Sequence, residues 1–279
     1  MTLYIVPTPI GNLEDITLRA LRVLKSVTLI AAEDTRTTRF LLKHFEISTP
    51  LTSYHEHNKL TKLDAIFAAL ASGDVALVSD AGTPGINDPG YELIREAVAR
   101  GIRVEPLPGA NAALCALVAS GLPTDGFVYL GFLPKKDKAR AEFLAQVADE
   151  PRTLILYESP NRLVEALAAL QAALGDRPAC VAREITKLHE EFQRGRLSEI
   201  AAHYQQTPPR GEIVIVVGGA PPVVVETWDE DRVRAALRAR LDAGEPLKLA
   251  AKALAAETGW DRRSIYSLGL ELAQDDSES

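Results

Sequence analysis

Three segments of the sequence combine glycine and proline with short polar side chains directly after apolar, β-branched runs. The longest is SDAGTPGINDPG, residues 79–90, which holds three glycines, two prolines and two aspartates. PTPIGN at residues 7–12 and PLPGAN at residues 106–111 follow two further apolar runs. Loops rich in residues with special backbone angles allow backbone N–H groups to approach a ligand closely. Three such loops in one region of the chain predict a single ligand-binding cleft.

Charged side chains that could move a proton or hold an anion lie at other predicted strand ends. EDTR occupies residues 33–36 and REITK occupies residues 183–187. A carboxylate can accept a proton, and an arginine or lysine can bind a phosphate. The spacing of REITK leaves two alternatives open, an ion-paired structural network and an anion-binding group. YESPNR at residues 157–162 is open to the same two interpretations.

The motifs of common nucleotide and metal sites do not occur in the sequence. It contains no G-x-G-x-x-G, no G-K-[ST], no H-E-x-x-H and no C-x-x-C. His55-Glu56-His57 lacks a second cluster of ligands, so a hydrogen-bonded loop is expected there rather than a zinc site. Neither a usual nucleotide site nor a metalloenzyme is therefore predicted.

The elements that must position these groups alternate between strands and helices, which indicates an α/β protein with parallel sheet. Turn formers at residues 119–126 (ASGLPTDG) predict a boundary between an α/β domain at 1–120 and a second at 121–222. Strands are predicted at residues 3–6, 28–31, 75–79, 103–107, 128–132, 153–157, 179–182 and 212–217. Helices are predicted at residues 17–26, 60–71, 91–100, 110–119 and 161–173.

The C-terminal region, residues 229–274, shows only helical spacing. Thr258-Gly259-Trp260-Asp261 offers a glycine C-cap followed at once by an aspartate N-cap, which indicates an all-α, helix-turn-helix-like domain. Between residues 232 and 263 there are eight basic and four acidic residues, a local excess of +4.

Composition describes a globular chain of 279 residues, 47% hydrophobic, with a net charge of −7. No apolar run approaches the roughly 20 residues of a membrane-spanning helix, and the N-terminus lacks the pattern of a signal peptide. Cys115 and Cys180 lie among apolar or small neighbours and are expected to be inert thiols in a reducing compartment. The net negative charge counts against a general nucleic-acid binder.

The quoted segments together resemble the bacterial small-subunit ribosomal RNA cytidine 2′-O-methyltransferases of the tetrapyrrole methylase superfamily. The resemblance covers residues 3 to about 218, and the helical region resembles the extension of the same subfamily. It implies two α/β domains of the tetrapyrrole methylase type with S-adenosylmethionine in the cleft between them. It also implies a cytoplasmic homodimer without a metal, which methylates the ribose 2′-hydroxyl of a cytidine in the decoding region of small-subunit ribosomal RNA.

The resemblance implies cofactor-binding residues by position. Those in its three cofactor loops are Pro9, Ile10 and Gly11; Thr83, Pro84, Gly85 and Ile86; and Asn111 and Ala112. PTPIG replaces the glycine-rich loop of many tetrapyrrole-methylating relatives, which favours an RNA substrate over a corrin or porphyrin.

A ribose hydroxyl is a poor nucleophile while protonated, so a base or an electrostatic aid is expected. Asp88, Asp34 and Lys187 are the predicted catalytic residues, chosen from a group that also contains Asp80 and Glu33. Positively charged side chains are expected to hold the RNA, namely Arg36, Arg183, Arg262 and Arg263, with Lys187 and the run from Lys135 to Arg140 as further candidates.

Two other functions remain compatible with the sequence. One is a tetrapyrrole or other small-molecule methylase on the same fold, and the other is a non-catalytic ribosome-assembly factor.

Overall fold

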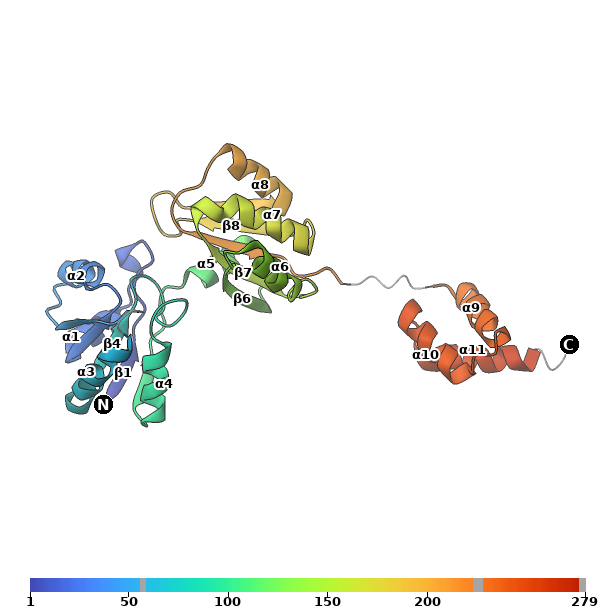
Figure 1. The fold of residues 1–279 in the computed structure, drawn as a ribbon, viewed down its shortest axis with the longest axis horizontal. Helices are drawn as coiled ribbons and strands as arrows, with labels where there is room; N and C mark the ends of the chain where they lie inside the picture. Colours follow the sequence, from blue (N-terminus) through green and yellow to red (C-terminus); the bar gives the residue numbers. More distant parts are fainter. Residues whose placement is uncertain (56–58, 223–227, 276–279) are drawn as a thin grey trace. The chain divides into compact units, whose positions relative to one another are not determined.

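The computed structural model describes residues 1–55, 59–222 and 228–275 and divides the chain into two compact units, Met1–Ala220 and Pro221–Ser279 (Figure 1). The first unit holds two five-stranded sheets, and the second is helical. His57 and Glu56 of the H-x-H segment lie outside the described residues.

The first sheet is entirely parallel, in the order β3-β2-β4-β1-β5. Its central strand β4 is buried along its whole length, because helices cover both faces of the sheet. The strands are β1 (Thr2–Ile5), β2 (Leu29–Ala32), β3 (Leu51–Ser53), β4 (Val75–Val78) and β5 (Arg103–Pro106). The helical segments are η1 (Leu13–Asp15), α1 (Leu18–Ser26), α2 (Thr35–His44), α3 (Lys59–Ser72) and α4 (Tyr91–Ala99).

The second sheet is mixed, in the order β6-β7-β10-β8-β9, and only its β6–β7 pair is parallel. The expectation of parallel sheet is therefore confirmed for the first sheet and wrong for most of the second. The strands are β6 (Phe127–Phe132), β7 (Thr153–Glu158), β8 (Pro178–Arg183), β9 (Glu191–Arg196) and β10 (Ile213–Val217). The helical segments are α5 (Ala112–Ser120), α6 (Asp137–Ala145), η2 (Pro160–Arg162), α7 (Leu163–Leu174) and α8 (Leu197–Gln206).

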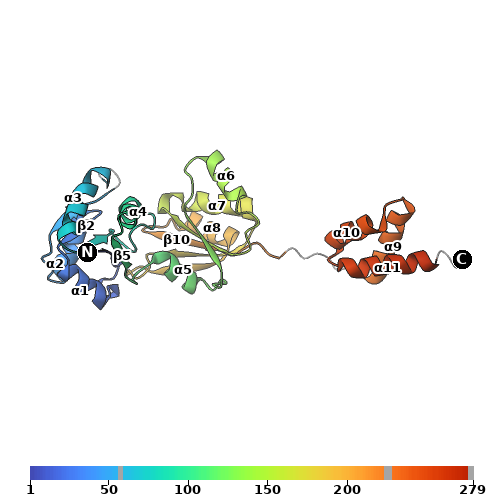
Figure 2. The same ribbon diagram turned by 90° about the horizontal axis from the view of Figure 1, so that it is seen from below.

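Helix α5 covers one face of the second sheet, and α6, α7 and α8 cover the other (Figure 2). Ala113, Ala116 and Leu117 of α5 pack against Ile155 and Val216 of this sheet. The helix thus packs with the sheet that follows it in the chain. The division into domains at residues 1–120 and 121–222 stays a prediction.

The buried side chain of Arg177 connects three segments near the end of the first unit. Arg177 donates to the carbonyl of Leu174 at 2.8 Å, to that of Gly218 at 3.4 Å and also to that of Ala148. Burial lowers the pKa of its guanidinium. One side chain therefore joins the end of α7, the segment after α6 and the segment after β10.

The second unit is a small bundle of α9 (Glu230–Asp242), α10 (Leu247–Thr258) and α11 (Arg262–Asp275) around Leu237, Leu254 and Ile265. Gly259 ends α10 with a φ of +70°, and Asp261 accepts hydrogen bonds from the N–H groups of Arg263 and Ser264. The predicted glycine and aspartate caps are confirmed. None of the helices among the described residues has the length and hydrophobicity to cross a bilayer.

The predicted positive charge of this unit requires a correction. Residues 228–275 contain eight basic and nine acidic side chains, because the acidic start of α9 and the end of α11 lie outside residues 232–263. Arg234 pairs with Glu230 and Glu271, both in this bundle. The unit has no overall positive charge, so any contact with RNA must depend on particular side chains.

Candidate active site

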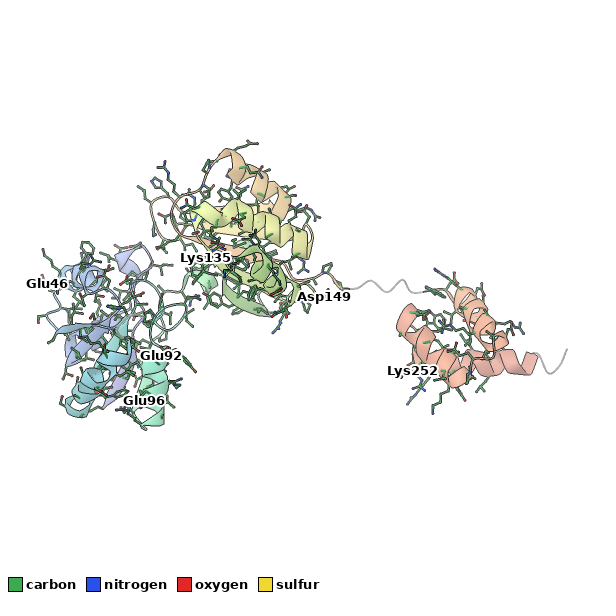
Figure 3. All side chains as sticks on the ribbon, viewed as in Figure 1. Glu46, Glu92, Glu96, Lys135, Asp149 and Lys252 are labelled. Atoms are coloured by element: carbon green, nitrogen blue, oxygen red, sulfur yellow. The ribbon has the colours of Figure 1, made fainter. Side chains whose placement is uncertain are left out.

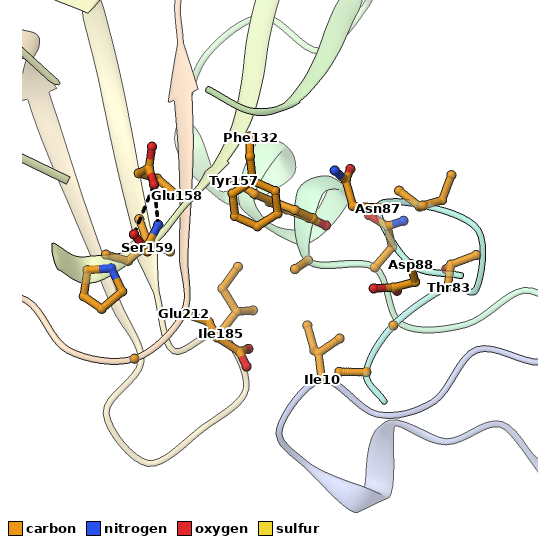
Figure 4. Close-up of a pocket in the computed structure, with 18 residues that line it drawn as sticks. Ile10, Thr83, Asn87, Asp88, Phe132, Tyr157, Glu158, Ser159, Ile185 and Glu212 are labelled. Atoms are coloured by element: carbon orange, nitrogen blue, oxygen red, sulfur yellow. Dashed lines mark hydrogen bonds between the residues drawn. The ribbon is translucent and has the colours of Figure 1, made fainter. Parts of the chain in front are cut away.

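A cavity of about 410 Å³ lies between the two sheets of the first unit (Figure 4). Its lining comes from the loops at the carboxyl ends of strands and from the segment before β10. From the first sheet's side the lining residues are Ile10, Ala81, Gly82, Thr83, Ile86, Asn87, Asp88, Asn111 and Ala112. From the second sheet's side they are Phe132, Tyr157, Glu158, Ser159, Pro160, Ile185, Gly211, Glu212 and Ile213.

The three glycine- and proline-rich loops meet at this cavity, as predicted. The backbones of Thr8 and Gly82 exchange two hydrogen bonds of 2.9 Å, which join the first loop to the second. The Thr83 hydroxyl donates to the carbonyl of Ala110 at 3.2 Å, which joins the second loop to the third. Asn111 caps α5 by accepting from the N–H of Leu114 at 3.1 Å. The parallel sheet brings these loops together because they follow neighbouring strands β1, β4 and β5.

Aromatic side chains form the opposite wall of the cavity. The rings of Phe132 and Tyr157 meet edge to face with centroids 5.7 Å apart, across from Asn87 and Asp88 (Figure 4). Tyr129 also packs edge to face against Tyr157. The hydroxyl group of Tyr129 donates a hydrogen bond to Asn87 Oδ1. This bond joins the second sheet to the loop after β4. The sequence indicated Tyr157 only as part of YESPNR, and Phe132 and Tyr129 were not predicted, although Phe132 ends a predicted strand, which was a usable signal.

The predicted cofactor residues divide into three groups. Those that line the large cavity are Ile10, Thr83, Ile86, Asn111 and Ala112. Pro9 and Gly11 instead line a smaller cavity of about 130 Å³. Pro84 and Gly85 line neither cavity, because they form the turn of the loop, where Gly85 has a φ of +84°.

Gly11 is a point of close approach between the two halves of the first unit. A Cβ at this position would lie 2.4 Å from Lys187 Cγ, 2.9 Å from Thr186 Oγ1 and 3.2 Å from the carbonyl oxygen of Ile185. Any larger residue would therefore displace the loop after β8. Glycine is required here by space and not by its backbone angles.

Asp88 is the carboxylate that lines the large cavity from the first sheet's side, whereas Glu158 and Glu212 line it from the second sheet's side. Burial raises the pKa of Asp88 to about 7, and repulsion from Glu33 and Asp80 adds to this, while a hydrogen bond with Ser79 opposes it. Carboxyl groups with such a pKa are suited to exchange protons near neutral pH. Asp88 therefore combines a place in the cavity lining with a raised pKa, and its catalytic role stays a prediction.

Asp34 is placed differently from Asp88. It caps α2 through the N–H of Arg36 at 2.8 Å, and its carboxylate pairs with the Arg36 guanidinium at 2.6 Å. The hydrogen bonds from Arg36 lower the pKa of Asp34 to about 2. Both residues line a separate acidic cavity of about 360 Å³, together with Glu33, Thr35, Ser53 and His55. Asp34 is therefore a weaker base than Asp88 and lies away from the large cavity.

The acidic side chains Glu33 and Asp80 connect the ends of β2 and β4. Glu33 Oε2 accepts from the Asp80 N–H at 3.3 Å, and Asp80 Oδ1 accepts from the Asp34 N–H at 3.0 Å. Burial raises the pKa of both carboxyl groups. The negative charges of Glu33 and Asp80 also raise the pKa of Asp88. The acidic cavity thus influences the protonation of a residue that lines the large cavity.

REITK forms an ion-paired network. Lys187 Nζ lies 2.8 Å from Glu184 Oε1 and 3.2 Å from Glu212 Oε2, and Arg183 Nε lies 2.8 Å from Glu191 Oε2. Burial disfavours the charge of Lys187, but its bonds to the two glutamates leave its pKa raised. A protonated ammonium cannot accept a proton, so Lys187 fits a positioning role. It reaches the large cavity through Glu212, which is part of the lining.

Arg262 and Arg263 belong to the second unit, where they begin α11 with exposed side chains. Within the described residues, no group of three His, Cys, Asp or Glu side chains is arranged to hold a metal ion.

Residues 2–201 match the family model of the tetrapyrrole (corrin/porphyrin) methylases. The chain is 48% identical over 275 residues to the ribosomal RNA small subunit methyltransferase I of Synechocystis sp., covering 98% of this chain and 99% of that one. It is 50% identical over 276 residues to the protein of that name from Escherichia coli O157:H7, covering 96% and 94%.

Solved structures of lower identity share the fold of the first unit. A cobalt precorrin-4 methyltransferase matches with a TM-score of 0.59 and 17% identity, covering 78% of this chain and 94% of that one. A uroporphyrin-III C-methyl transferase from Thermus thermophilus, complexed with S-adenosyl homocysteine, matches with a TM-score of 0.55 and 21% identity, covering 78% and 97%. The chain therefore belongs to the tetrapyrrole methylase family and, within it, to the ribosomal RNA small subunit methyltransferase I proteins.

Proposed function

We propose that this protein transfers a methyl group from S-adenosylmethionine to the ribose 2′-hydroxyl of a cytidine in the decoding region of small-subunit ribosomal RNA. One observation carries this proposal. The identity to ribosomal RNA small subunit methyltransferase I extends over 98% of the chain and so includes the helical unit, whereas the general methylase model ends at residue 201. A tetrapyrrole methylase would leave the shared helical unit without a role.

The large cavity fits S-adenosylmethionine. Its volume of about 410 Å³ lies in the usual range for sites that enclose a small ligand. Ile10, Ile86, Ile185 and Ile213 supply apolar surface, and the capped start of α5 at Asn111 offers backbone N–H groups nearby. We assign cofactor contact to Ile10, Thr83, Ile86, Asn111 and Ala112. Pro9, Gly11, Pro84 and Gly85 hold the shape of the loops.

The chemistry assigned to the chain is the removal of a proton and the orientation of a hydroxyl. S-adenosylmethionine, when bound, supplies an electrophilic methyl group. Asp88 accepts the proton of the ribose hydroxyl, because its pKa of about 7 lets it be ionised at neutral pH and still hold a proton firmly. Rigid loops keep the reacting groups aligned, which is itself a large part of the rate enhancement.

The predicted phosphate-binding residues retain separate roles in this proposal. Arg36 has a side chain that is 86% exposed and can exchange part of its contact with Asp34 for a phosphate. Arg183 and Lys187 hold the loop after β8 in place through their ion pairs. Arg262 and Arg263 contact RNA from the helical unit. We further propose that the protein acts as a homodimer in the cytoplasm, without a metal.

The test is to measure the ribose methyl in cells that lack this protein. Mass spectrometry of small-subunit RNA from a deletion strain should show one missing 2′-O-methylcytidine, and the wild-type chain should restore it. Asp88→Ala should fail to restore it, whereas Asp34→Ala should restore much of it. Full methylation by both variants would refute the assignment of the base.

Two further measurements separate the alternatives. If purified protein methylates precorrin-type substrates but not ribosomal subunits, it is a small-molecule methylase. If calorimetric titration with S-adenosylmethionine gives no heat, the protein is a non-catalytic assembly factor.

A further inference from the structure

We propose that the segment Phe132–Lys138, at the edge of the large cavity, is the surface that holds the RNA backbone next to the methylation site. The proposal rests on the proposed function, since it names where the RNA substrate is bound. It assigns roles to side chains outside the cofactor loops and the proton acceptor.

The first argument is uncompensated charge. The segment carries Lys135, Lys136 and Lys138, all exposed, and Lys135 is labelled in Figure 3. Among the described residues, the side chains of Lys135 and Lys136 have no ion-pair or hydrogen-bond partner. Lys138 lies 3.9 Å from Glu142 in an exposed pair, which contributes little. Three ammonium groups therefore face solvent within four residues.

The one acidic residue within the segment does not cancel this charge. Asp137 pairs at 2.8 Å with Arg140, whose side chain is only 9% exposed and also pairs with Glu165 at 2.6 Å. Asp137 thus shares Arg140 with Glu165, and its own side chain is 87% exposed, so it offsets at most one of the three lysine charges. The exposed face of the segment keeps a positive field, even though the chain as a whole has a net charge of −7.

The second argument is that the segment is held rigidly to the cavity wall. The Arg162 guanidinium donates to the carbonyls of Leu133 and Pro134 at 3.1 and 3.2 Å. Glu158 supports it, with Oε2 3.5 Å from Arg162 Nη2, and Glu158 itself is buried and part of the cavity lining. A binding surface fixed in this way loses little conformational freedom when RNA binds.

The third argument is an exposed aromatic ring at the start of the segment. Phe132 is 51% exposed, lines the cavity and is steadied edge to face by Tyr157. RNA-binding proteins commonly stack an unpaired base on such a ring while basic side chains hold the flanking phosphates. One short segment therefore offers a base platform and phosphate contacts in sequence, beside the carboxylate that accepts the proton.

The predicted cationic residues elsewhere in the first unit are less available for this role. Arg36 pairs with Asp34, Arg183 with Glu191, and Lys187 with Glu184 and Glu212. Each must give up or share an existing partner to bind a phosphate. Lys135 and Lys136 have no partner to give up, and Lys138 has only a weak exposed pair with Glu142.

The test compares two charge reversals of equal size in the full-length protein. Lys135→Glu/Lys136→Glu alters the segment, and Lys25→Glu/Lys43→Glu alters exposed lysines in the last turns of α1 and α2. Binding to small ribosomal subunits from the deletion strain is measured between roughly 50 and 200 mM salt. Each lost phosphate contact lowers the salt slope by about 0.7, so the segment variant should lose about 1.4 in slope and bind about 25-fold more weakly at about 0.1 M salt.

The control pair should keep its affinity for subunits within about threefold, and S-adenosylmethionine should bind both variants as it binds the wild type. Equal losses in the two pairs, or an unchanged salt slope in the segment variant, would overturn the proposal. So would a loss of cofactor binding in the segment variant, since that indicates a structural role. If the wild-type protein itself fails to methylate subunits, the proposed function fails, and this result is distinct from all of these.

Two further single variants test the base platform and the positioning role separately. Phe132→Leu keeps an apolar side chain at the cavity, and without added cofactor it should weaken subunit binding about fivefold or more. Arg162→Gln should raise the KM for subunits more than it lowers kcat, because it frees the segment without removing its charges. Unchanged subunit affinity in Phe132→Leu would refute the stacking role, and a purely kcat effect in Arg162→Gln would refute the positioning role.

Discussion

Replacing Asp88 with asparagine is expected to stabilise the folded protein at pH 8 while it removes the proposed base. In the folded chain burial raises the pKa of Asp88 to about 7, whereas its ordinary value is 3.8. Between these two pH values the folded protein holds the proton and the unfolded chain does not. The free energy of unfolding of the wild type must therefore fall as pH rises through this interval, relative to a variant that cannot titrate.

The size of the effect follows from the same two values. A difference between 3.8 and about 7 corresponds to about 4 kcal/mol at high pH. Asp88 is only half-buried, so water screens much of this, and about 1–2 kcal/mol is the reasonable expectation. For a unit of about this length, that raises Tm by about 2–8 °C.

The assay is calorimetric unfolding of wild type and Asp88→Asn at pH 4 and pH 8. The variant should melt higher at pH 8 and show a much smaller difference at pH 4, where Asp88 is protonated in the folded chain and only partly ionised in the unfolded chain. Asp125→Asn, the same change at an exposed aspartate, serves as the control and should show no such dependence. An Asp88→Asn variant with equal Tm differences at both pH values, or a lower Tm at pH 8, would refute the burial of an uncompensated charge.

Three further outcomes follow from the site. Under single-turnover conditions the methylation rate should rise about tenfold per pH unit up to about pH 7 and then level off, because Asp88 must lose its proton to act; a profile that is flat between pH 5 and pH 8 contradicts this. Gly11→Ala should weaken S-adenosylmethionine binding about tenfold in titration calorimetry by displacing the loop after β8, whereas Gly126→Ala, whose Cβ would meet the flexible Arg152 side chain, should not. Arg262→Glu/Arg263→Glu should weaken the binding of small ribosomal subunits in a filter assay. The helix content measured by circular dichroism should not change, because acidic residues suit the start of α11. Equal binding by wild type and variant would show that these arginines do not contact the RNA.

The sequence was sufficient to predict the parts of the fold that depend on local pattern. Fully apolar β4 and the glycine-rich loop after it were predicted, because a buried parallel strand and its turn leave clear signals. Strand β9, with the sequence EFQRGR, was missed, since its side chains do not alternate between apolar and polar. Helix α2 was missed because Asp34 and Arg36 were taken as site residues, although they also form its capped start.

The candidate site could be predicted as a set of loops but not as a set of roles. Asp88 and Asp34 are both aspartates in polar loops, and only their surroundings separate a pKa of about 7 from one of about 2. That difference arises mainly from the burial of Asp88 and from the hydrogen bonds of Arg36 to Asp34, with a smaller effect of Glu33 and Asp80, and all of these depend on the packing of β2 against β4. Tyr157 and Phe132 come from the second sheet, and no local pattern indicates that they face the loop after β4.

The position of β10 has a consequence for how the protein is made. This strand is the last of the first unit in the chain but lies in the middle of its sheet, between β7 and β8. During synthesis, β7 and β8 therefore each have one edge without a hydrogen-bonded neighbour until β10 has left the ribosome. Such unpaired edges are prone to aggregation. Substitutions in β10 should accordingly reduce the yield of soluble protein. They should have less effect on the methylation rate of the molecules that do fold.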